Sequence, residues 1–220
     1  MCYNGDMRII FPELATNSIA KEAVKSFEGI EFLPADNLNE ACEMLSQADS
    51  MISGLDHSSR DVLLAYKEHV PLKSKFFSSC FICEKGNQHF ALADGVVNKL
   101  PTTEQLYTIV EDTAKTFETY YNETPKIAML SYSTNGSGGK NPDLVKIHQV
   151  INQIRENHKD WLIDGEMQLD AAINPEISAK KFPNSVIKGQ ANVLITPDLN
   201  SGNILYKSLE RFGGVFDNGI

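Results

Sequence analysis

The chain has 220 residues, 42% of them hydrophobic and 22% charged, which is long enough for one large domain or two small ones with a buried core. Its formal net charge of −9 argues against nucleic acid and anionic membranes as main partners, because an anionic surface repels both. No apolar run approaches the roughly 20 residues that cross a bilayer, and the first residues lack a signal-peptide pattern, so we expect a cytoplasmic protein.

Strand and helix patterns alternate along the first third of the chain. Apolar strands are predicted at 7–13, 30–34 and 50–54, and amphipathic helices at 17–27, 37–48 and 58–70. Asn17 or Ser18 would cap the first helix, and Ser58 or Ser59 the third. This alternation is typical of a parallel α/β unit.

The segment 73–94 has a different pattern, two strands around the turn residues Lys85-Gly86-Asn87, which predicts an antiparallel hairpin. Cys80 and Cys83 form a CxxC motif within it, and one such motif is at most half of a zinc site. Because strand residues three apart point to opposite faces, we expect reduced structural thiols and no metal.

The alternation then continues to the end of the chain. Helices are predicted at 102–121, 143–157, 175–182 and 203–212, strands at 126–132 and 191–198, and a strand followed by a helix at 162–173. The fold class is therefore α/β, with three layers and a mostly parallel sheet that contains one antiparallel hairpin.

The loop SYSTNGSGGKNPDL, residues 131–144, lies between a strand and a helix. It fits neither the Walker A motif, since Asn141 follows Gly139-Lys140, nor the GxGxxG fingerprint. A strand that ends in flexible polar residues before a helix still presents backbone N–H groups to an anion, with hydroxyls from Ser133, Thr134 and Ser137. The same residues suit a plain turn, and the pattern leaves both interpretations open.

The segment LITPDLNSGNILYK, residues 194–207, has the same design of strand, polar loop and helix. In an open α/β sheet, two such loops lie along the carboxyl edge of the strands, where ligands bind. The alternative is that Asp198, Asn200 and Asn203 only cap the helix and turn the chain.

Three blocks, MLSYSTNGSGG (129–139), 162–185 and 191–214, resemble the phosphate acetyl/butyryltransferase family in order and spacing. Similar stretches begin at Asp49, whereas the preceding residues match weakly. The resemblance implies an isocitrate dehydrogenase-like fold of two lobes, here a reduced first lobe at 1–54 and a second lobe at 55–220, usually in a homodimer. It also implies the reaction of acetyl-CoA and phosphate to acetyl phosphate and CoA, with CoA as a substrate and no metal or tightly bound cofactor.

The resemblance also assigns substrate-binding residues to both motifs and to a turn near the junction of the lobes. They are Ser133, Thr134, Gly136 and Ser137; Asp198, Asn200, Gly202, Asn203, Tyr206 and Lys207; and His57, Ser58 and Ser59. Taken by itself, His57 favours a capping or surface role, which is the usual one for a lone histidine before a helix. The expected partners are CoA, phosphate or an acyl phosphate, with no nucleic acid and no membrane.

The family continues after RFGG into a D-L-S-R-G block with a serine, an arginine and an aspartate base, and this sequence shows no such block after Gly214. The catalytic residues are therefore unassigned, with Asp56, Asp94, Asp170 and Asp198 as candidate bases. Two hypotheses remain: a shortened acyltransferase of weak activity or completed by a partner chain, and a non-catalytic relative that binds CoA, an acyl phosphate or another subunit.

Overall fold

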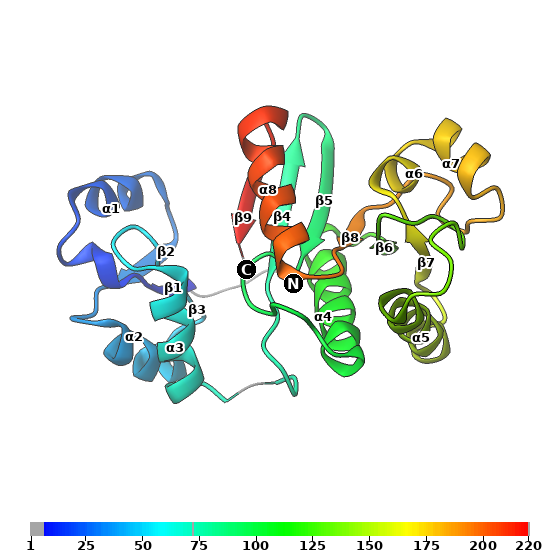
Figure 1. Ribbon diagram of the computed structural model, residues 1–220. Helices are drawn as coiled ribbons and strands as arrows, with labels where there is room; N and C mark the ends of the chain where they lie inside the picture. The colour runs from blue at the N-terminus through cyan, green and yellow to red at the C-terminus, as the bar shows by residue number, and fades with distance from the viewer. Residues whose placement is uncertain (1–6, 72, 220) are drawn as a thin grey trace. The chain divides into compact units, whose positions relative to one another are not determined.

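The structure is a computed structural model that describes residues 7–71 and 73–219 (Figure 1). It divides into two compact units, one up to Lys73 and one from Ser74. The lobe boundary predicted from the sequence, between residues 54 and 55, lies before helix α3 (Ser59–His69). This helix packs on α2 (Leu38–Met44), and His69 Nδ1 lies 3.8 Å from Glu43 Oε1, so α3 belongs to the first unit.

The first unit contains a parallel sheet of three strands, β1 (Met7–Ile10), β2 (Ile30–Leu33) and β3 (Ser50–Met51), in the order β2-β1-β3. Helix α1 (Ser18–Ala23) connects β1 to β2, α2 connects β2 to β3, and short 3-10 turns lie at Pro12–Leu14, Val24–Ser26 and Leu45–Gln47. Ile10, Ala35 and Ala41 form the centre of its core. Asn17 caps α1 and Ser58 caps α3. In both helices the cap is one of the two residues predicted for it.

The second unit is built on a sheet of six strands in the order β7-β6-β8-β5-β4-β9. The strands are β4 (Cys80–Lys85), β5 (Gln88–Ala93), β6 (Lys126–Leu130), β7 (Leu162–Met167), β8 (Val193–Ile195) and β9 (Phe216–Gly219). Only β4 runs antiparallel to its neighbours, which confirms a mostly parallel sheet with one antiparallel excursion. The sequence pattern did not predict β9.

Helices cover both faces of this sheet, so the second unit has three layers (Figure 1). Helices α4 (Thr103–Tyr121) and α5 (Pro142–Asn157) pack on one face, and α6 (Leu169–Ile173), α7 (Pro175–Lys181) and α8 (Leu199–Gly213) on the other. Helix α4 begins with a capping box, in which Thr102 and Gln105 exchange side-chain and backbone hydrogen bonds.

The two cysteines of the CxxC motif belong to the hydrophobic clusters on opposite faces of the sheet, as predicted. Burial raises the pKa of the Cys80 thiol to about 12, so this thiol stays protonated and unreactive at neutral pH. Within the described ranges, no group of three or more His, Cys, Asp or Glu side chains could hold a metal ion. In the same ranges, no helix is long and apolar enough to cross a membrane.

Candidate functional site

The two loops singled out in the sequence follow neighbouring parallel strands, β6 and β8, at the carboxyl edge of the second sheet. The first loop leads into α5 on one face of the sheet, and the second leads into α8 on the other. Neighbouring strands whose connections leave on opposite faces form a topological switch point, where α/β proteins bind ligands. The fold thus brings the two predicted loops to the expected edge.

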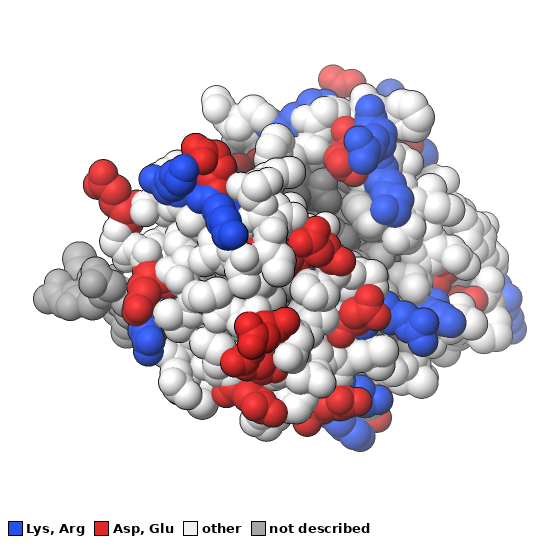
Figure 2. Space-filling model, turned by 90° about the vertical axis from the view of Figure 1, so that its left-hand side faces the viewer, with Lys and Arg blue, Asp and Glu red and all other residues white. Residues whose placement is uncertain are grey.

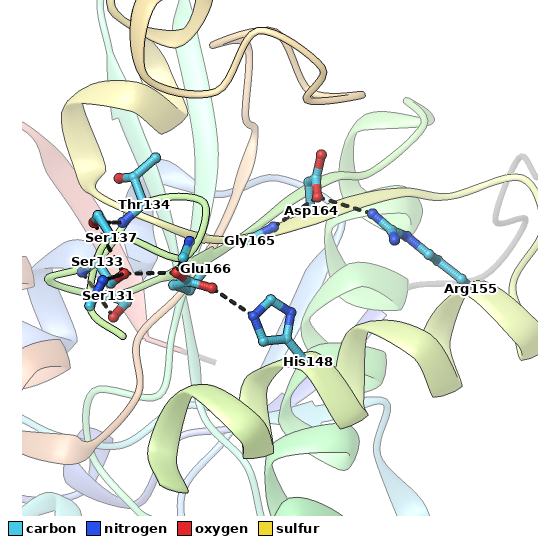
Figure 3. A network of polar contacts seen from close by, with 11 residues as sticks. Ser131, Ser133, Thr134, Ser137, His148, Arg155, Asp164, Gly165 and Glu166 are labelled. Carbon is cyan, nitrogen blue, oxygen red and sulfur yellow. Dashed lines mark hydrogen bonds and ion pairs between the residues drawn. The ribbon is translucent and has the colours of Figure 1, made fainter. Parts of the chain in front are cut away.

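Glu166, near the end of β7, organises the first of these loops (Figure 3). Its side chain is fully buried, and its Oε1 accepts hydrogen bonds from the Ser133 hydroxyl and the Gly136 amide, both at 2.7 Å. Ser133 Oγ in turn accepts a hydrogen bond of 2.7 Å from the Gly138 amide. A buried carboxylate therefore holds the centre of the glycine-rich loop.

The backbone donors in the central part of the loop, residues 133–139, are used within the protein. Each amide from residue 133 to residue 139 donates to an acceptor within the second unit. In chain order, starting with the amide of Ser133, the acceptors are Ser131 Oγ, Ser137 Oγ, the Glu166 carbonyl, Glu166 Oε1, the Thr134 carbonyl, Ser133 Oγ and the Gly136 carbonyl. An anion could be cradled by these amides only by displacing Glu166 and rearranging the turn. In this conformation, contacts to a ligand come from side chains such as the exposed Ser137.

His148, on α5, faces the second oxygen of the same carboxylate. Its Nε2 lies 2.7 Å from Glu166 Oε2, but not in hydrogen-bond geometry. Oε2 is buried and has no hydrogen-bond partner among the described residues. Burial by itself would raise the pKa of Glu166; the hydrogen bonds from Ser133 and Gly136 and the charge of His148 outweigh it and lower the pKa. Glu166 is therefore an anion at neutral pH, paired with a half-exposed imidazole.

A second buried carboxylate fixes β7 against α5 (Figure 3). Asp164 Oδ1 lies 3.0 Å from Arg155 Nη2, and its Oδ2 accepts a hydrogen bond of 3.0 Å from the Val186 amide. Arg155 also donates to the Ile163 carbonyl. These contacts hold the strand from which Glu166 projects.

The second loop is packed tightly against the turn that follows β5. Gly202, in the first turn of α8, is buried, and a Cβ atom at this position would lie 2.0 Å from the Asp94 carbonyl oxygen. Asn203 Nδ2 donates to the Gly95 carbonyl at 3.1 Å. Asp198 accepts from the Ser201 amide and is therefore the cap of α8, which decides between Asp198 and Asn200.

The remaining residues of the second motif differ in exposure. Tyr206 stacks on Phe81 with ring centroids 4.2 Å apart, and Lys207 Nζ lies 4.7 Å from the centre of the Tyr206 ring. Asn200 and Lys207 are exposed. Asp198, Asn203 and Tyr206 are half-buried, and Gly202 is buried.

Asp94 itself, a candidate base from the sequence, is fully engaged. Its carboxylate accepts from the Ser79 hydroxyl, the amides of Val96, Val97 and Asn98, and the Asn98 side chain. These five donors tie the carboxylate of Asp94 to the turn that follows β5.

The other three candidate bases are engaged as well. Asp198 caps α8, and Asp56 accepts from Asn17. Asp170 pairs with Lys181, whose hydrogen bond lowers the pKa of Asp170. None of the four aspartates therefore stands out as a base.

His57 and Ser58 lie in the first unit, after β3. Ser58 caps α3 by accepting a hydrogen bond from the Asp61 amide. His57 Nδ1 lies 3.0 Å from Oε1 of Glu13, a buried glutamate in the 3-10 turn Pro12–Leu14 that follows β1. Glu13, Glu166 and His148 were not predicted as site residues from the sequence. For the two glutamates, the sequence does contain a signal: a charged residue inside or next to an apolar strand, as Glu13 in FPE (11–13) and Glu166 in DGEM (164–167).

Charge on the face drawn in Figure 2 is mixed, with acidic side chains singly and in small groups and basic side chains between them. This face carries no continuous basic stripe of the kind that binds nucleic acid.

The sequence profile of the family described as phosphate acetyl/butaryl transferase matches residues 15–219. The chain belongs to this family. The phosphate acetyltransferase of Treponema pallidum is 39% identical over 188 residues, which are 80% of this chain and 56% of that protein. That of Clostridium acetobutylicum is 40% identical over 172 residues, 74% of this chain and 51% of that protein.

Among solved structures, a phosphotransacetylase from Streptococcus pyogenes superposes with a TM-score of 0.82 at 27% identity, covering 96% of this chain and 83% of that one. The family resemblance and the α/β fold predicted from the sequence are thereby confirmed. The chain spans about half the length of the curated phosphate acetyl/butaryl transferase relatives it matches.

Proposed function

We propose that the chain is an acyltransferase scaffold of the phosphotransacetylase type, which converts acetyl-CoA and phosphate to acetyl phosphate and CoA. The observation that carries the proposal is the pair of loops after β6 and β8, which flank a topological switch point. The family profile matches the chain from residue 15 to residue 219, a range that includes both loops. The names of the relatives, phosphate acetyltransferases, support the substrate class.

In this proposal, the substrate contacts come from side chains at the edge of the sheet. Ser133, Thr134, Gly136 and Ser137 shape one side, and Asp198, Asn200, Gly202, Asn203, Tyr206 and Lys207 the other. Lys207 supplies a positive charge for a phosphate group, and the exposed hydroxyl of Ser137 supplies a hydrogen bond. Such a site works by positioning two substrates and stabilising the charge that develops on the acyl oxygen.

A second candidate function is binding of CoA or an acyl phosphate without turnover. The engagement of Asp56, Asp94, Asp170 and Asp198 by other groups favours it, because none of them is left as an obvious base. The homodimer and the cytoplasmic location stay predictions from the sequence.

Formation of acetyl-CoA from acetyl phosphate and CoA, with calorimetry of CoA binding on the same sample, separates the two candidates. Turnover that falls in Lys207→Ala and Ser137→Ala supports the acyltransferase. Binding without turnover supports the second candidate, and neither binding nor turnover contradicts both.

A further inference from the structure

The buried carboxylate of Glu166 fixes the direction of the hydroxyl protons in the first loop (Figure 3). A carboxylate only accepts, so the Ser133 hydroxyl donates its proton to Glu166 Oε1, at 2.7 Å. Ser133 Oγ also accepts from the Gly138 amide at 2.7 Å. Ser133 therefore has no proton left for Ser137, whose Oγ lies 3.3 Å from Ser133 Oγ, and Ser137 is the donor in this contact.

Ser137 is thereby left with an acceptor position for a ligand. Its proton is directed to Ser133 Oγ, and its oxygen accepts a hydrogen bond of 3.0 Å from the Thr134 amide. A hydroxyl oxygen has a second lone pair, and Ser137 is exposed. The ligand group that Ser137 recognises is therefore a hydrogen-bond donor.

The rest of the first loop offers little to an anion. Every backbone amide from residue 133 to residue 139 donates within the second unit. Thr134 is 6% exposed, and its hydroxyl oxygen accepts from the Gln168 amide at 2.9 Å. A phosphate group that used the Gly136 amide would have to displace the buried carboxylate of Glu166. These features favour a neutral ligand group that donates hydrogen bonds.

The second loop leads into a helix that has the opposite character. Lys207 on this helix is exposed, with its Nζ 4.7 Å from the centre of the Tyr206 ring, and it carries the positive charge that suits a phosphate group. Pantetheine, the arm of CoA that ends in the thiol, is uncharged and carries amide N–H groups and an S–H group. The neutral arm of CoA and the anionic phosphate thus match the two loops separately.

We propose that the first loop binds the pantetheine arm of CoA, and that Ser137 recognises this arm by accepting a hydrogen bond from its amide or thiol. This inference rests on the proposed function, in which CoA is a substrate and Lys207 meets the phosphate group. The contact makes and breaks no covalent bond. Ser137 selects the neutral arm over the anion and positions it at the edge of the sheet.

The test measures the affinities of pantetheine and of inorganic phosphate separately, by NMR titration of the whole chain. We expect Ser137→Ala to weaken pantetheine binding about 3–10-fold, which corresponds to one hydrogen bond, and to leave phosphate binding unchanged. Unchanged phosphate binding also shows that the variant is folded. Ser137→Thr keeps the hydroxyl and should bind pantetheine as the wild type does. Lys207→Ala should give the reverse pattern, with about tenfold weaker phosphate binding.

The matched control is Thr119→Ala. This change removes an exposed hydroxyl near the end of α4, which leads to the start of β6 and so lies at the opposite edge of the sheet. It should leave both affinities unchanged. S-Methylpantetheine, which has no thiol proton, distinguishes the two donors of the arm. If the thiol is the donor, Ser137→Ala weakens the binding of pantetheine alone; if an amide is the donor, it weakens both ligands equally.

Equal pantetheine affinity in Ser137→Ala and Thr119→Ala, or no pantetheine binding to the wild type, would overturn the inference. Phosphate binding that falls in Ser137→Ala, or in Lys140→Ala at the exposed end of the first loop, would place the anion there and overturn it as well. The assay of acetyl-CoA formation separates this failure from failure of the proposed function. Ser137-dependent pantetheine binding without turnover contradicts the acyltransferase and supports this inference. Turnover with pantetheine binding that does not depend on Ser137 does the reverse.

Discussion

Glu166 is the residue on which the conformation of the glycine-rich loop depends. Its carboxylate takes the Ser133 hydroxyl and the Gly136 amide, two groups that an anionic ligand would otherwise use. The loop is therefore held in shape by a negative charge from the protein itself. Two of its Ser, Thr and Gly residues are thus direct partners of one buried carboxylate, through the Ser133 hydroxyl and the Gly136 amide.

We expect Glu166→Gln to destabilise the second unit by about 2 kcal/mol, because two charge-assisted hydrogen bonds become neutral ones and the pairing with His148 is lost. Urea denaturation at pH 7 measures the change. Glu156→Gln on the exposed side of α5 is the control and should change stability by less than about 0.5 kcal/mol. Equal stability of the two variants would show that Glu166 does not organise the loop.

Glu13 makes the first unit sensitive to acid. Burial by itself would raise its pKa, but hydrogen bonds from Gly54, His57 and Ser53 lower it from 4.5 to about 2. The charged form is thus favoured in the folded state, so the stabilisation is complete above pH 4.5 and disappears as the pH falls toward 2. A shift of this size corresponds to about 3 kcal/mol.

Glu13→Gln should therefore remove most of the loss of stability of the first unit between pH 4.5 and pH 2, and lower its stability at pH 7. Denaturation curves at a series of pH values measure both effects. Glu22→Gln removes an exposed ion pair with Lys25 and serves as the control. If Glu13→Gln kept the full acid dependence of the wild type, the carboxylate of Glu13 would not be its source.

Helix α8 is positioned by a single close approach of its backbone to the turn after β5. A Cβ atom at Gly202 would lie 2.0 Å from the Asp94 carbonyl oxygen and 2.7 Å from Thr196 Oγ1. Gly202→Ala should cost about 2–3 kcal/mol despite the better helix propensity of alanine, because backbone must move. Thermal denaturation measures the cost.

The matched control lies at the other end of the same helix. At Gly213, a Cβ atom would meet Val215 at 3.6 Å, an ordinary contact. Gly213→Ala should be neutral or slightly stabilising. Similar effects at both positions would contradict the close packing of α8 on the turn.

At the level of elements, the sequence predicted most of what the structure contains. Helix α4 was predicted from its apolar periodicity, and its start is fixed by the local capping box of Thr102 and Gln105. Strand β9 was missed because its four residues show no alternation and pair only with β4, far away in the chain. The two loops of the candidate site were predicted from local composition. Glu166, the partner of the loop after β6, was not predicted, because its contact with Ser133 spans 33 residues.

The whole molecule consists of two units with separate cores. The core around Ile10 lies entirely before residue 74, whereas the two clusters that cover the second sheet lie entirely after it. The same separation holds for the two buried glutamates, each beside a histidine: Glu13 with His57 and Glu166 with His148.

Separate cores predict separate unfolding. Ile10→Ala removes a fully buried side chain and should cost about 2–4 kcal/mol in the first unit alone. Hydrogen exchange followed by mass spectrometry should show faster exchange up to residue 73 and unchanged protection after it. Ile127→Ala in the second sheet should give the reverse pattern. Loss of protection throughout the chain in both variants would mean that the units unfold as one.

The proposed substrate site at the loops after β6 and β8 can be tested by amide NMR shifts on addition of acetyl phosphate. We expect perturbed amides clustered in residues 131–141 and 196–203, with a weaker response in Lys207→Ala. Shifts confined to other parts of the chain, or none at millimolar acetyl phosphate, would contradict it.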